Sequence, residues 1–162
     1  MQTRSRRFAA GVALVIPLIL HAQGGSLPGD VKSACDAAYA IVTKSAGIKT
    51  RRSNGSFTDE AFRAPIIGCR IQIDGSFKKA EKTGAVPDVL HTGLDAQGWS
   101  ELLDFSSDGP DGTSFAFRRE AVACHARGQW DGGSDGEPET PPVDQYKVTV
   151  ICGKAAMFVR PE

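Results

Sequence analysis

The chain has 162 residues with 19 basic and 19 acidic side chains, so its formal net charge is zero. Phosphate contact needs clustered lysine and arginine, and this balance argues against a nucleic-acid-binding protein. The length fits one domain with a hydrophobic core of its own.

The N-terminal residues are typical of a secretory signal peptide. Residues 1–7 hold three arginines and no acidic residue, residues 8–20 are almost continuously apolar, and small residues follow at Ala22 and Gly24. This order defines such a signal, and the apolar run is shorter than the roughly 20 residues that a bilayer span needs. We expect a signal peptide over residues 1–24, a single exported α+β domain over 25–162 in a bacterial periplasm or medium, and no stable membrane span after cleavage.

Two export routes remain open. Arg6 and Arg7 form a twin arginine, but the alanines that follow favour ordinary unfolded export. Because Arg4, Arg6 and Arg7 leave with the signal, the mature chain has three more acidic than basic residues.

The first expected helix covers residues 30–46. Asp30 is suited to its N-cap, and Gly47 is suited to end it. Six apolar residues recur at helical spacing and predict one buried stripe: Val31, Ala34, Cys35, Ala38, Ile41 and Val42.

Residues 48–64 show little pattern, and a half-buried strand is then expected over residues 67–73, with Cys69 on its apolar face. A second helix is expected over residues 86–97, because Pro87 is tolerated in a first helical turn and Gly98 follows its end. Strands are then expected around residues 99–105, 115–117, 121–130 and 144–153, separated by turn sequences. The order predicts an α+β fold in which two helices pack on a mostly antiparallel β-meander of about five strands.

Four cysteines predict two disulfides in an exported chain. No Cys-x-x-Cys pair exists, so the spacing fits neither a zinc knuckle nor a thioredoxin-like site. Cys124 and Cys152 lie at nearly opposite positions of two strands joined by the loop over residues 131–143, which leaves Cys35 to pair with Cys69. Each bond closes a loop that adds about 3–4 kcal/mol in the chain-entropy model.

No catalytic, cofactor-binding or metal-binding residue is predicted. Residues 132–136 match Gly-x-Ser-x-Gly, but the prolines and acids that follow do not allow the helix that this motif requires. Two groups of turn carboxylates lack the calcium-loop spacing and are interpreted as solvated turns: Asp131, Asp135, Glu137 and Glu139, and Asp104, Asp108 and Asp111. His125 is expected beside Arg127 and Gln129 on the sheet face opposite Cys124, and His91 is expected to be exposed.

The sequence is therefore compatible with two functions. The first is a non-enzymatic module that binds another exported or envelope protein through Trp99, Trp130 and the 131–143 loop. The alternative is a small extracytoplasmic hydrolase that uses His125 with turn carboxylates. The alternative requires a carboxylate within hydrogen-bond reach of His125 and a concave pocket beside it.

Overall fold

The computed structural model describes residues 26–44, 49–59, 61–130 and 145–160. The expected signal peptide, its cleavage site and the 131–143 loop lie outside these residues. Within the described part, no helix combines the length and the apolar character needed to cross a membrane.

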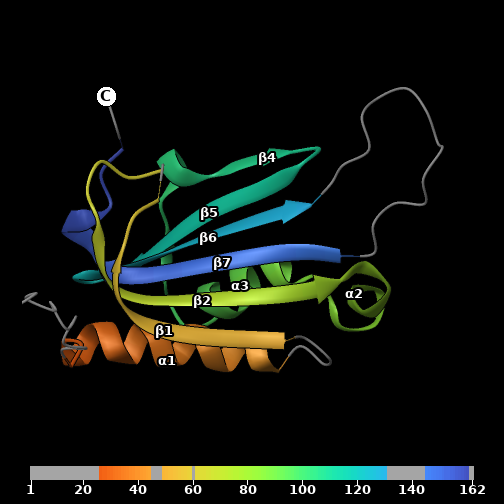
Figure 1. Cartoon of the computed structure of the whole chain (residues 1–162), viewed down its shortest axis with the longest axis horizontal. Helices are drawn as coiled ribbons and strands as arrows, with labels where there is room; N and C mark the ends of the chain where they lie inside the picture. The colour runs from red at the N-terminus through yellow and green to blue at the C-terminus, as the bar shows by residue number, and fades with distance from the viewer. Residues whose placement is uncertain (1–25, 45–48, 60, 131–144, 161–162) are drawn as a thin grey trace, which may run out of the picture.

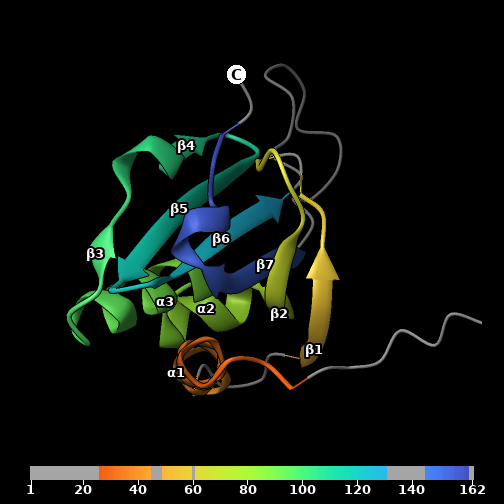
Figure 2. The same cartoon turned by 90° about the vertical axis from the view of Figure 1, so that its left-hand side faces the viewer.

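The domain is α+β and is built on an antiparallel sheet of seven strands in the order β1-β2-β7-β6-β5-β3, with β4 paired to β5 (Figure 1; β3 is labelled in Figure 2). The strands are β1 (Lys49–Phe57), β2 (Ile66–Ser76), β3 (Ser100–Glu101), β4 (Ser107–Gly109), β5 (Gly112–Arg119), β6 (Val122–Trp130) and β7 (Gln145–Lys154). The β5–β6–β7 part is a meander, and β2 returns to lie beside β7.

The expected number of about five strands is therefore too low. The edge strand β1 gives no sequence signal, because none of its nine residues is buried and its apolar alternation is absent. The strands β3 and β4 have only two and three residues, and such short edge strands carry too few positions for a period to be recognised.

Three α-helices lie on one side of the sheet (Figure 2). Helices α1 (Gly29–Thr43) and α3 (Val86–Asp95) are the two expected ones, and α2 (Phe77–Thr83) is additional. Asp30 lies just inside α1 rather than at its N-cap, where Pro28 stands. Its carboxylate accepts hydrogen bonds from the Val31 N–H, at 2.9 Å, and from the Lys154 ammonium group, so it still holds the start of the helix.

The larger core lies between these helices and the sheet. The stripe predicted for α1 is buried there in full. On α3, the Val86 N–H donates to the Tyr146 hydroxyl at 3.1 Å, which joins the start of the helix to β7. The apolar positions of β2, Cys69, Ile71 and Ile73, face the same core.

A smaller core covers only one end of the opposite face. It is formed by Phe62, Ile66, Phe105, Ala116, Ala123, Ile151 and Phe158. The segment after β1, the 3₁₀ helix η1 (Leu103–Phe105) and the residues around the 3₁₀ helix η2 (Ala155–Met157) supply its outer layer. The rest of this face, which we call the open face, carries mostly polar side chains.

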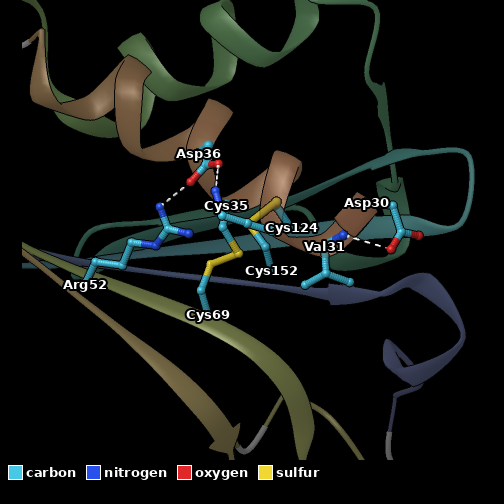
Figure 3. The surroundings of a disulfide bond; sticks show 9 residues. Asp30, Val31, Cys35, Asp36, Arg52, Cys69, Cys124 and Cys152 are labelled. Atoms are coloured by element: carbon cyan, nitrogen blue, oxygen red, sulfur yellow. Dashed lines mark hydrogen bonds and ion pairs between the residues drawn. A yellow bond between two sulfur atoms is a disulfide. The ribbon is translucent and has the colours of Figure 1, made fainter. Parts of the chain in front are cut away.

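The four cysteines meet between α1 and the sheet (Figure 3). Cys35 is bonded to Cys69 and joins α1 to β2, and Cys124 is bonded to Cys152 and joins β6 to β7. This is the pairing expected from the sequence. Because Cys69, Cys152 and Cys124 are also cross-strand partners, they form one row over three neighbouring strands.

Candidate binding site on the open face

One row of polar side chains crosses six strands of the open face. Successive members are cross-strand partners, so they project from the same face of the sheet. The row comprises Arg51, Gln72, Thr149, Arg127, Ser114 and Ser107. It lies opposite the helices, because Gln72 is three residues from Cys69 on β2 and side chains alternate between faces. We call this set the polar row.

The flanking rows add basic side chains. Lys49, Asp74, Lys147 and Gln129 are successive partners on one side. Ser53, Arg70, Ile151 and His125 are successive partners on the other side, where Ile151 belongs to the smaller core and His125 packs against it. Over the four strands β1, β2, β7 and β6, these three rows hold five basic residues and one acidic residue, Asp74. Asp74 lies 3.7 Å from Arg51 and offsets its charge. Because the other basic residues of the rows outnumber it, this part of the open face is positively charged, although the mature chain as a whole is expected to be acidic.

The polar row runs into a hollow of about 590 Å³ beside β4, β5 and β6. Polar side chains dominate its lining: Ser107, Asp108, Asp111, Thr113, Ser114, His125, Arg127 and Gln129. The hydroxyls of Ser107 and Ser114 lie 2.8 Å apart, and the Thr113 hydroxyl donates to the Ser107 carbonyl at 3.2 Å. These bonds fix the β4–β5 hairpin that forms one wall of the hollow.

His125 lines the hollow but is only 3 % exposed. Its ring makes edge contacts with Phe62, at a centroid distance of 5.0 Å, and with Phe105, at 6.1 Å. Burial lowers the pKa of His125 to about 4; Asp59 opposes this shift, and the charges of Arg127 and Arg160 add to it. The ring is therefore neutral at pH 7. His125 does lie on the sheet face opposite Cys124, but Phe62 and Phe105 cover its ring there.

The hollow meets one of the two requirements of the hydrolase alternative. It lies beside His125 and includes the turn residues Asp108 and Asp111. Among the described residues, however, the histidine that pairs with a carboxylate is His91, whose Nε2 lies 3.4 Å from Glu101, and not His125. An imidazole with a pKa of about 4 is also a weak base at neutral pH. The arrangement is better suited to binding than to proton transfer.

The tryptophans do not lie on this surface. Trp99 is 3 % exposed beneath the Arg119 guanidinium, so the expectation that it contributes a binding surface is wrong. Trp130 is half-buried, and its indole N–H donates to the Pro110 carbonyl. It pairs across the sheet with Tyr146, which belongs to the helix-side core. Both rings serve the fold.

One group of potential metal-ligating atoms occurs among the described residues. The sulfurs of Cys35, Cys69 and Cys152 all lie within 4.8 Å of one another. Each is bonded in a disulfide, so none is available as a thiolate.

Comparison of the chain with family models, with curated proteins and with solved structures finds no match. Sequence reasoning found His125 and Arg127 but missed the polar row, because its members are scattered between positions 51 and 149 and only the strand pairing brings them together.

Proposed function

We propose that the protein is an exported, non-enzymatic binding module whose binding site is the open face, with the hollow at one end of it. The observation that carries this proposal is the polar row. Six hydrogen-bonding side chains from six strands face the same way, and none of them is fully buried. A solvated face of an antiparallel sheet carries polar side chains in any case, and what distinguishes this face is that its row runs into a hollow.

The frame behind the row is rigid. One disulfide ties β6 to β7, which carry Arg127 and Thr149, and the other ties β2, which carries Gln72, to α1. Side chains held on a fixed scaffold lose less conformational entropy on binding, so a ligand is bound more tightly than on a mobile loop. The same disulfides favour an oxidising compartment and thus support export.

The test places a bulky side chain in the hollow. Gln129 is exposed and lines the hollow, whereas Gln97 is exposed at the end of α3 on the other side of the sheet. Gln129→Trp and Gln97→Trp make the same chemical change at the two places. Two-dimensional NMR titration with a panel of neutral and acidic monosaccharides and dicarboxylates is expected to shift amides of β4 to β7 in the wild type and in Gln97→Trp.

The Gln129→Trp variant is expected to lose these shifts while it keeps its fold. Shifts that survive in Gln129→Trp, or that map to α1 and α3, would show that the open face is not the binding site. The hydrolase alternative predicts instead that a probe ester is turned over and that His125→Gln abolishes the turnover.

A further inference from the structure

The length of the polar row determines what kind of ligand can use all of it. Neighbouring strands lie about 4.8 Å apart, so six strands place the two ends of the row about 24 Å apart. A single small molecule fills the hollow but does not reach β1. An occupant of the whole row is a chain that lies across the strands.

The charges determine the sign of that chain. Asp108 and Asp111 lie at the hollow end of the polar row. In the three rows over β1, β2, β7 and β6, Arg51 and Lys147 are exposed, Arg70 and Arg127 are partly exposed, and the acidic residue is Asp74. Guanidinium groups bind carboxylates in a bidentate geometry. The ligand that complements this part of the open face is an anion with repeated carboxylates.

The neutral members of the row add a second requirement. Gln72 and Thr149 lie between the two arginines, and Ser114 and Ser107 lie beyond Arg127. All four offer donors and acceptors that suit hydroxyl groups. Nucleic acid fits less well, because single strands are bound by aromatic side chains that stack on the bases. The polar and flanking rows hold no tryptophan, tyrosine or phenylalanine, and the ring of His125 is buried. An anionic membrane fits less well, because these rows expose no large apolar side chain for insertion.

We infer that the open face binds a linear acidic polysaccharide, a chain of uronic-acid sugars that crosses β1 to β4 along the polar row. This inference rests on the proposed function and specifies its ligand. The carboxylates pair with Arg51, Arg127 and Lys147, and the sugar hydroxyls bond to the neutral members of the row.

The test uses polygalacturonate as the probe and charge reversal outside the hollow. The double variant Arg51→Glu/Lys147→Glu changes two exposed positions on β1 and β7, and Lys82→Glu makes the same kind of change on α2, on the other side of the sheet. Binding is measured by calorimetry at two salt concentrations. The wild type and Lys82→Glu are expected to bind with an affinity that falls as salt rises, and loss of two ionic contacts is expected to weaken the double variant by about tenfold or more.

The outcomes separate this inference from the proposed function. Equal binding by the double variant and Lys82→Glu overturns the inference, and so does tighter binding of duplex DNA, polyglutamate or phosphatidylglycerol vesicles than of polygalacturonate. If polygalacturonate does not bind while Gln129→Trp still abolishes the monosaccharide or dicarboxylate shifts, the binding module stands and only its proposed ligand is wrong.

Discussion

At the scale of single residues, His125 makes the stability of the fold depend on pH. Its pKa is about 4 in the fold, against an ordinary value of 6.5, because the ring is buried. The unfolded chain therefore binds the proton first, and stability is lost as pH falls from about 6.5 to about 4. The groups that act on the ring are Asp59, Arg127 and Arg160.

We expect the free energy of unfolding to be about 2 kcal/mol lower at pH 5 than at pH 7, from the pKa difference of His125. His125→Gln should remove this loss, and urea denaturation at the two pH values measures it. The pKa of Asp30 is lowered because the Lys154 side chain holds its carboxylate ionised. The pKa of Asp36 is lowered because the side chains of Lys32 and Arg52 hold its carboxylate ionised. Their contribution disappears only below about pH 4, so an equal loss in His125→Gln would contradict the assignment to His125.

The cysteine cluster gives a second prediction at this scale. In Cys124→Ser, the Cys152 thiol is released with its sulfur within 4.8 Å of those of Cys35 and Cys69. A Cys152 thiolate that attacks the Cys69 sulfur forms a Cys69–Cys152 bond and releases Cys35 as the thiolate, with no change in the number of disulfides. We expect both isomers in Cys124→Ser after alkylation and non-reducing peptide mapping.

Cys152→Ser is the matched control, because its free thiol is Cys124, which is not among the three converging sulfurs. This variant should keep the Cys35–Cys69 bond alone. A single isomer in Cys124→Ser at pH 8 would show that the sulfurs do not come into reacting geometry.

At the scale of elements, the packing of α1 against α3 depends on a close approach at Gly93. A methyl group at Gly93 would lie 2.8 Å from the Cγ2 of Ile41, whereas one at Gly29, at the start of α1, would meet nothing within 4 Å. Gly93→Ala gains up to about 1 kcal/mol of helix propensity, but overpacking costs about 1–3 kcal/mol.

We therefore expect Gly93→Ala to lower the free energy of unfolding by about 1 kcal/mol, and Gly29→Ala to raise it by about 0.5 kcal/mol. Urea denaturation of the two variants beside the wild type measures both changes. A Gly93→Ala variant more stable than the wild type would mean that α1 and α3 move apart without cost.

At the scale of the whole molecule, the two faces of the sheet have different tasks. One face is closed by three helices and two disulfides, and the other keeps its basic and polar side chains within reach of solvent. Over β1, β2, β7 and β6 the three rows of the open face are predominantly basic, with five basic residues and one acidic residue.

Export of the whole chain predicts a defined mature product. Expressed from its own N-terminus in a bacterium, the chain should lose residues 1–22 or 1–24 and reach the periplasm or medium with no free thiol. Intact mass and non-reducing peptide mapping should show Cys35 linked to Cys69 and Cys124 to Cys152. Full-length, reduced protein confined to the cytoplasm would contradict export.

The sequence alone determined the parts of the fold that depend on local periodicity. The apolar stripe of α1, the alternation of β2 and the position of Cys124 opposite Cys152 around one loop can all be read within a short stretch, because burial on one face repeats with the period of a helix or a strand. The α+β class and the disulfide pairing follow from these patterns.

Only the tertiary structure decided which strands are neighbours, and the candidate site depends on this. No local period marks β1, and no spacing along the chain relates Arg51 to Thr149 or Arg127. The pairings of β1 with β2, of β2 with β7 and of β7 with β6 bring these three residues into one row. That register is set by non-local burial of the two cores, so the polar row and the hollow beside His125 exist only once the whole sheet has formed.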